Sequence, residues 1–192
     1  GLAIITNAGG NGVMAADACS DYGLMLASFE KSTVEKLKGY LPEAANVYNP
    51  VDVLGDATAA RYDFAIKTVM EDPNVSCVAV LLAPLDTVDI KAVAEHLATF
   101  GGKVSIPVVG AFVGGTKTNK GIELLHEANV PCYDSPDKAI RALGAMVHYK
   151  KMKDASSDTS PVVINGDKER VKEVIEAVRK TGRTSMSESE GK

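Results

Sequence analysis

The fold of this chain is decided near its start, where the sequence reads Leu2-Ala3-Ile4-Ile5-Thr6-Asn7-Ala8-Gly9-Gly10-Asn11-Gly12-Val13-Met14. The apolar, β-branched run 2–6 predicts a strand, and a helical pattern runs from about Gly12 to Tyr22, where Gly23 ends it. A glycine-rich turn between a strand and a helix leaves backbone N–H groups at the positive end of the helix dipole. Such a helix end favours anions, most often phosphate, so this stretch also supplies a functional hypothesis.

Short apolar runs alternate with longer amphipathic stretches over residues 1–152. Further strands are predicted at 24–29, 77–82, 108–113 and 130–133, whereas 46–55 is expected to be irregular. Runs 77–82 and 108–113 are continuously apolar, which is typical of strands that are buried on both faces. The alternation predicts an α/β fold, a flavodoxin-like three-layer sandwich around a five-stranded parallel sheet of order 2-1-3-4-5.

Residues 153–192 are expected to form a linker and a helix rather than a second core. A polar linker is predicted at 156–161, followed by one helix over 167–180 with its apolar side chains on a single face. A lone helix buries too little surface to fold as a domain, so this segment is expected to lead into a further module. Both ends of the sequence are expected to continue into a longer polypeptide.

The composition excludes several classes of function. The chain has 192 residues and a net charge of −4 without a basic block, which argues against a nucleic-acid partner. No run approaches the ~18 apolar residues of a membrane span, so no membrane partner is expected. The cysteines have no disulfide or zinc spacing, and they are interpreted as buried apolar side chains in a reducing, cytoplasmic compartment: Cys19, Cys77 and Cys132.

The sequence offers a phosphate cradle but no nucleophile. The histidines all lie in helical patterns, away from the strand ends, and none is expected to be catalytic: His96, His126 and His148. No catalytic residue and no metal site is therefore predicted in this chain. The candidate phosphate-binding residues are those of the opening turn: Asn7, Gly9, Gly10, Asn11 and Gly12. Their spacing is neither G-x-G-x-x-G nor a P-loop, so the turn could also be only a tight strand-to-helix connection.

Two other loops are expected to support the opening turn. The first is Asn49-Pro50-Val51-Asp52, where Asn49 is held extended by the following proline and Asp52 can cap a neighbouring turn. The second is Gly114-Gly115, which follows the fourth strand. Asp52 can be interpreted as a staple of its own loop or as part of the border of a phosphate site.

Taken together, these motifs resemble the NDP-forming acyl-CoA synthetases, a family that includes ADP-forming acetyl-CoA synthetase. The resemblance rests on segments in family order over roughly residues 1–150: 4–12, 15–17, 49–55, 107–115, 121–125 and 130–133. Residues 174–188 are similar to the lead-in to the ATP-grasp module of that family. Asn11 stands where the family commonly has proline, which preserves a backbone N–H at that position.

The resemblance implies a part in a reversible reaction, in which an acid, CoA and ATP give acyl-CoA, ADP and phosphate through an acyl phosphate and a phosphohistidine. The phosphohistidine is carried by another domain, and the opening turn would support it from one side. By this resemblance the chain alone is inactive and holds no cofactor, whereas the full enzyme uses CoA, ATP/ADP and Mg. Its partners would be the CoA-binding domain, the phosphohistidine-bearing domain and the ATP-grasp module, in a full form that is an oligomer.

Two alternatives remain open from the sequence. Protein lysine acetyltransferases with fused synthetase-like regulatory domains share the same motifs, and this sequence does not separate them from synthetases. A free-standing flavodoxin-like module that binds a flavin is less well supported. Its first loop would favour serine and threonine with aromatic side chains nearby, whereas this loop is built from glycine and asparagine and the chain has no tryptophan.

Overall fold

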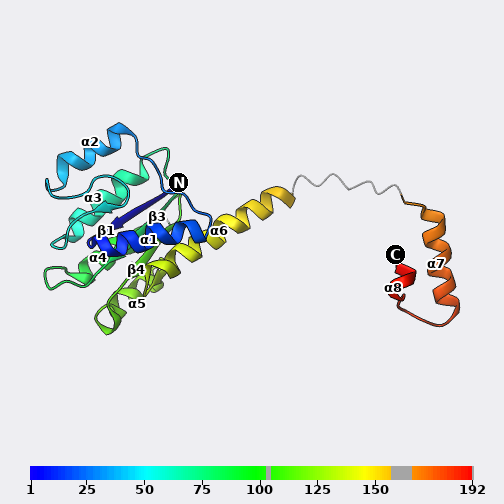
Figure 1. Ribbon diagram of the computed structural model, residues 1–192. Coiled ribbons are helices and arrows are strands. Elements are labelled where there is room, and N and C mark those ends of the chain that lie inside the picture. Colours follow the sequence, from blue (N-terminus) through cyan, green and yellow to red (C-terminus); the bar gives the residue numbers. More distant parts are fainter. Residues whose placement is uncertain (103–104, 157–165, 192) are drawn as a thin grey trace. The chain divides into compact units, whose positions relative to one another are not determined.

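The computed structural model describes residues 1–102, 105–156 and 166–191, which fall into two compact units, Gly1–Lys153 and Asp154–Lys192. The first unit holds a five-stranded, all-parallel sheet of order β2-β1-β3-β4-β5 (Figure 1). Its strands are β1 (Leu2–Thr6), β2 (Val51–Asp52), β3 (Cys77–Leu82), β4 (Val108–Phe112) and β5 (Cys132–Tyr133). The predicted α/β fold and the predicted strand order are confirmed.

Helices cover both faces of this sheet. The helical segments are α1 (Gly9–Asp21), α2 (Lys31–Tyr40), α3 (Ala59–Met70), α4 (Ile90–Ala98), the 3-10 turn η1 (Gly115–Lys117), α5 (Asn119–Glu127) and α6 (Pro136–Ser156). Alternate residues of each strand point to opposite faces, so the sheet separates two apolar cores. One core contains side chains of α2, α3, α4 and α5, and the other contains side chains of α1 and α6.

The edge of the sheet beside β1 differs from the sequence prediction. The predicted strand at 24–29 is wrong, because this segment forms only a single bridge, between Leu26 and Leu2. The strand instead lies at Val51–Asp52, within the segment expected to be irregular, and pairs with Ile5 and Thr6. Two separate segments therefore share one edge of β1, the first along its start and the second along its end.

Several element ends also differ from the prediction. Helix α1 begins at Gly9, three residues before the predicted start at Gly12, because the extended Ala8 lets the helix begin directly after the turn. Strand β5 spans only two residues, and α6 continues to Ser156. The earlier start of α1 is the important difference, because it makes Gly9 and Gly10 the first two helical residues.

The second unit contains α7 (Lys168–Lys180) and α8 (Glu188–Gly191). The Asp167 side chain accepts a hydrogen bond from the Arg170 N–H at 3.1 Å and so caps α7, which confirms the predicted helix. Val178 is buried, whereas Val171 is 56% exposed. The predicted linker at 156–161 lies outside the described residues, except that Ser156 ends α6.

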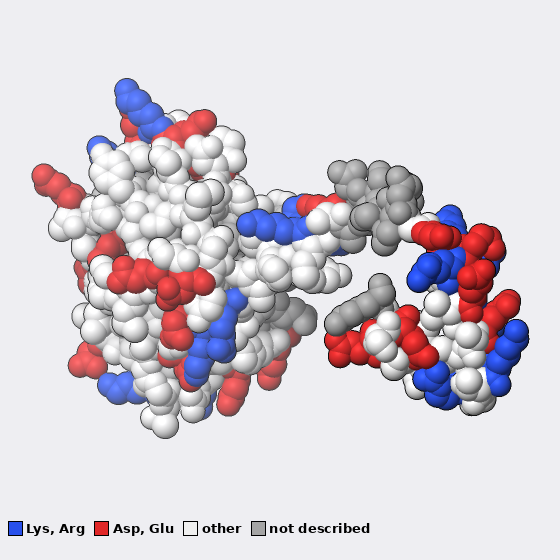
Figure 2. All heavy atoms as spheres, turned by 45° about the vertical axis from the view of Figure 1, so that its right-hand side comes forward, with Lys and Arg blue, Asp and Glu red and all other residues white. Residues whose placement is uncertain are grey.

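Acidic and basic side chains are interspersed on the face of the molecule shown in Figure 2. Within residues 1–102, 105–156 and 166–191, none of the helices is long and apolar enough to cross a membrane.

Candidate functional site

The carboxyl ends of parallel strands meet at one edge of a sheet, and in this protein that edge gathers the loops after β1, β2, β3 and β4. The loop after β1 is fixed by Asn7, which is only 3% exposed. Its side-chain amide donates to the Ala83 carbonyl at 2.9 Å, and its side-chain oxygen accepts from the Ala83 N–H at 2.8 Å. Both polar atoms of Asn7 thus join the ends of β1 and β3, so its side chain takes a structural role.

The first turn of α1 presents free backbone donors. Its N-cap residue, Ala8, is extended (φ −145°, ψ 111°) and has no side chain that could cap the helix. The N–H groups of Asn11 and Gly12 bond back to the Ala8 carbonyl at 3.0 and 3.3 Å. Within the described part of the chain, the exposed Gly9 and Gly10 have no acceptor for their N–H groups, so these two donors are available to an anion.

The glycines of the turn have different surroundings. A Cβ on Gly10 would meet nothing within 4 Å, and one on Gly9 would lie 3.4 Å from Oδ2 of Asp52. A Cβ on the buried Gly12 would lie 3.1 Å from Cγ2 of Thr6 and 3.4 Å from Cβ of Pro50. Gly12 therefore allows the helix to pack closely, whereas Gly9 and Gly10 keep the approach to the helix end open.

Asn49 holds the loop before β2 against β1. The peptide bond between Asn49 and Pro50 in this loop is cis. Its side-chain oxygen accepts from the Ile4 N–H at 2.9 Å. Its side-chain amide donates to the carbonyls of Leu2 at 2.7 Å and Ala27 at 2.9 Å. Asn49 therefore bridges the gap between the 24–29 segment and β2, which is a structural role.

Asp52 acts as a staple of its own loop, which is one of the two interpretations left open by the sequence. Its Oδ1 accepts from the Leu54 N–H at 2.9 Å, which staples the loop after β2. Its Oδ2 lies on the side of Gly9, where the negative charge of the carboxylate interacts favourably with the positive end of the α1 dipole. Leu54 adopts φ +71°, a conformation that is rare for a non-glycine residue. Nothing in the sequence signals this conformation.

The predicted glycine pair after β4 joins the same assembly of loops. A Cβ on Gly114 would collide with the Pro84 ring, and Gly115 has φ +58°, where the lack of a side chain is an advantage. Pro84 follows Ala83, the residue bonded to Asn7. A continuous set of contacts therefore runs from the loop after β1 to the loop after β4, through Ala83 and Pro84, which the sequence reasoning did not identify.

Several other polar groups near this edge are paired within the fold. The buried Tyr62 hydroxyl donates to the Leu81 carbonyl at 2.9 Å, and burial together with the charge of Asp52 raises the pKa of Tyr62 well above its usual value. Arg61 donates to Asp56 at 2.6 Å, and this hydrogen bond lowers the pKa of Asp56. Arg61 also donates to the Val53 carbonyl at 2.9 Å, so its charge is committed to the loop after β2.

The histidines and cysteines lie elsewhere. Nδ1 of His96, on α4, is 3.9 Å from Oδ1 of Asp63; Nε2 of His126, on α5, is 2.8 Å from the Cys132 carbonyl; and His148 is exposed on α6. The cysteines are free and buried, and burial raises the pKa of Cys132 to about 12. Within the described residues, no group of three or more histidine, cysteine or acidic side chains could hold a metal ion.

In sequence, this chain is similar to one protein family and to two ligases that are described here. Residues 2–157 match the family described as Ligase-CoA domain. Acetate–CoA ligase [ADP-forming] I of Archaeoglobus fulgidus is 36% identical over 181 residues, which are 94% of this chain and 26% of that protein. Acetate–CoA ligase [ADP-forming] of Methanocaldococcus jannaschii is 40% identical over 156 residues, which are 79% of this chain and 22% of that protein.

Two solved structures are also similar to this chain. The apo form of dinucleotide forming acetyl-coenzyme A synthetase 1 from Ca. Korarchaeum cryptofilum has a TM-score of 0.76 and 25% identity, over 84% of this chain and 36% of that one. PH0766 from Pyrococcus horikoshii OT3 has a TM-score of 0.74 and 34% identity, over 78% of this chain and 35% of that one. The chain spans about a quarter of the length of the curated relatives given above.

Proposed function

We propose that this chain, which belongs to the Ligase-CoA domain family, forms one domain of an ADP-forming acyl-CoA ligase. The full enzyme would convert an acid, CoA and ATP reversibly into acyl-CoA, ADP and phosphate. The relatives named as ADP-forming acetate–CoA ligases support this assignment. The alternative of a regulatory domain in a lysine acetyltransferase has no support among those relatives, all of which are named as ligases.

In this enzyme, the N–H groups of Gly9 and Gly10 would bind the phosphoryl group of a phosphohistidine carried by another domain. The two free donors at an uncapped, exposed helix end are the observation that carries this proposal. A phosphoryl group carries roughly two negative charges, and a helix end offers about half a positive charge, worth about 0.3–2 kcal/mol. Backbone donors bring this stabilisation without a side chain that would compete for the proton of the histidine.

The remaining predicted site residues would act around these two donors. Asn11 closes the first turn through its N–H, and Gly12 lets α1 approach Pro50. Asn7 and Asn49 fix the loops through their side chains, and Gly114 and Gly115 shape the loop after β4. Asp52, with Oδ2 close to Gly9, would border the bound phosphoryl group.

We assign CoA, ATP/ADP and Mg to other domains of the same enzyme. A structure from Ca. Korarchaeum cryptofilum that resembles this chain was determined in complex with phosphate and ADP. The partners of this domain would be the CoA-binding domain, the phosphohistidine-bearing domain and the ATP-grasp module, and the full protein would be an oligomer. Free, buried cysteines are typical of a reducing compartment, which supports a cytoplasmic location.

A matched pair of substitutions at Gly9 tests the phosphoryl site. Gly9→Pro removes one N–H donor, and the fold can accept it because proline suits the first helical position and Ala8 is already extended. Gly9→Ala keeps the N–H and is the control. Titration of the 192-residue chain with inorganic phosphate, followed by amide NMR shifts, should show binding at Gly9 and Gly10. The affinity read from the Gly10 amide, which both variants keep, should be about tenfold weaker in Gly9→Pro than in Gly9→Ala. Equal affinity in the two variants, or shifts that map to another surface, would contradict the proposal.

A further inference from the structure

The first turn of α1 carries one polar side chain that the fold leaves unused. Asn11 is the third residue of this helix, after Gly9 and Gly10, and it is half-buried. Within the described residues its side-chain amide makes no hydrogen bond, whereas every side-chain nitrogen or oxygen that is buried there has a partner. The NH₂ group and the oxygen of Asn11 are therefore reachable from solvent beside the helix end.

Thr6 already performs the usual task of a side chain at the third helical position. Such a side chain commonly reaches back and bonds the backbone N–H of the N-cap residue. In this turn the N–H of the N-cap residue, Ala8, donates to Oγ1 of Thr6 at 3.1 Å, and the Thr6 hydroxyl donates to the Ala8 carbonyl at 2.9 Å. Asparagine is also a weaker helix former than alanine. Neither capping nor helix propensity therefore explains an amide at this position.

The amide of Asn11 lies close to the two free backbone donors of the turn. Side chains of an α-helix lean toward its N-terminus, so the Asn11 side chain runs along the first turn toward the N–H groups of Gly9 and Gly10. Gly10 has no side chain that would separate the amide from these donors, and a Cβ there would meet nothing within 4 Å. An anion that binds to the two backbone donors therefore lies within reach of the NH₂ group.

We propose that the side-chain NH₂ group of Asn11 is a third donor to the phosphoryl group, an inference that rests on the phosphoryl site proposed above. A phosphoryl group has three terminal oxygens that accept hydrogen bonds. The N–H groups of Gly9 and Gly10 serve two of these oxygens, and the amide serves the third. A hydrogen bond to a charged acceptor is stronger than one between neutral groups, so this single amide contributes measurably to the affinity.

Titration of the 192-residue chain with inorganic phosphate at constant ionic strength tests this role by amide NMR. The side-chain NH₂ signals of Asn11 should shift with the same Kd as the backbone signals of Gly9 and Gly10. Asn11→Ala removes the NH₂ group, introduces a good helix former and should weaken phosphate binding about tenfold. Asn119→Ala, at the exposed start of α5, is the matched control and should bind phosphate as the parent chain does.

A second variant separates the donor from the shape of the turn. Asn11→Gln keeps an NH₂ group one methylene further out and should bind phosphate within about threefold of the parent chain. If Gly9 and Gly10 shift but Asn11→Ala binds equally well, the NH₂ signals stay unmoved, or Asn11→Gln loses as much affinity as Asn11→Ala, the third donor is overturned and the proposed phosphoryl site is kept. If Gly9 and Gly10 do not shift in the parent chain, the phosphoryl site is overturned, and this inference with it.

Discussion

The side chain of Asn7 has one donating and one accepting atom, and both are bonded to the backbone of a single residue, Ala83. Asn49 likewise bonds to three backbone groups along the edge of β1. Such a side chain replaces the backbone of a missing strand residue, because a carboxamide carries the same donor and acceptor as a peptide group. At both positions the amide keeps buried backbone groups paired where the regular ladder of the sheet ends.

Asn7→Asp tests this role at the residue scale. The substitution keeps the shape of the side chain but replaces the donor to the Ala83 carbonyl with a carboxylate oxygen in a buried site. We expect the free energy of unfolding at pH 7 to fall by about 3 kcal/mol, measured by urea denaturation. The loss should shrink at acidic pH, because the protonated carboxyl group can donate again.

The control for this prediction is Asn11→Asp. Asn11 is half-buried in the first turn of α1, and within the described residues its side chain makes no hydrogen bond. An acidic group at a helix N-terminus is neutral or slightly stabilising, so this variant should keep the unfolding free energy of the parent chain. A loss of similar size in both variants would show that charge near the turn, and not the bond to Ala83, causes the effect.

At the scale of elements, sequence patterns predicted what hydrophobic periodicity determines. The continuous apolar runs predicted all of β3 and all of β4, with one residue too many at the end of β4, because a strand buried on both faces has no polar positions. The same reasoning failed at 24–29, where an apolar run makes one bridge and Met25 remains 81% exposed. The actual strand, Val51–Asp52, is too short to have a periodicity, and tertiary hydrogen bonds through Asn49 hold it in position.

The geometry of the candidate site could be predicted from the sequence only in part. The order strand, glycine turn and helix placed the turn at the carboxyl edge of the sheet, where the structure has it, but the first helical residue depends on the backbone angles of Ala8, which the sequence pattern does not encode. That difference of three residues separates Gly9 and Gly10, whose donors are free, from Gly12, whose N–H is already bonded. The structural role of Asn7 depends on Ala83, 76 residues away, and such a contact has no local signal.

Asn49→Ala tests how the split edge of β1 is held together. The substitution removes three hydrogen bonds and leaves the backbone N–H of Ile4, a fully buried residue, without its partner. We expect the unfolding free energy to fall by about 2–4 kcal/mol, and hydrogen exchange at the Ile4 amide to become faster. Asn119→Ala, at an exposed position at the start of α5, is the control and should change the stability little. Unchanged protection at Ile4 in Asn49→Ala would show that water or backbone movement replaces the lost bonds.

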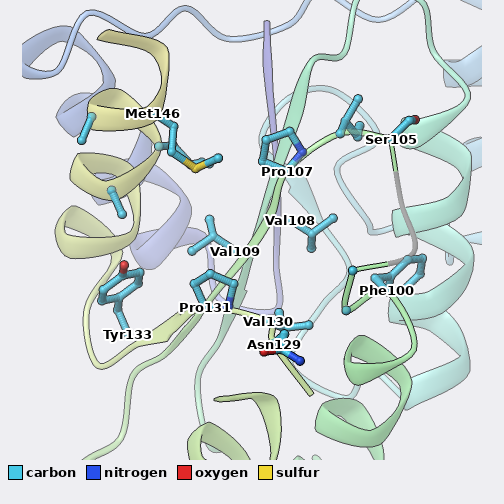
Figure 3. A pocket seen from close by; sticks show the side chains of 16 residues that line it. Phe100, Ser105, Pro107, Val108, Val109, Asn129, Val130, Pro131, Tyr133 and Met146 are labelled. Carbon is cyan, nitrogen blue, oxygen red and sulfur yellow. The ribbon is translucent and has the colours of Figure 1, made fainter. Parts of the chain in front are cut away.

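At the scale of the whole molecule, the parallel sheet separates two ends with different properties. Its carboxyl end gathers the glycine turn and the loops that support it, whereas an apolar groove of about 590 Å³ beside Val108 and Met146 lies at its amino end (Figure 3). The helices after each strand run back toward the amino end, so His96 and His126, late in α4 and α5, are carried away from the glycine turn. A phosphorylated histidine at Gly9 and Gly10 would therefore have to come from another domain.

The absence of a local acceptor leads to a prediction for the isolated chain. Incubation of the 192-residue chain with acetyl phosphate, or with ATP and Mg²⁺, should give no acid-labile phosphate on protein, measured by ³¹P NMR or by radiolabel. A histidine that is phosphorylated at the proposed site has to reach the N–H donors at the start of α1. None of the three histidines lies in a loop at the carboxyl edge of the sheet, where these donors are. A full-length ADP-forming acetate–CoA ligase, treated in the same way, is the positive control. Label that appears on the isolated chain and disappears in His96→Gln, His126→Gln or His148→Gln would mean that the acceptor lies within this domain, and that the phosphoryl site is not completed by a partner.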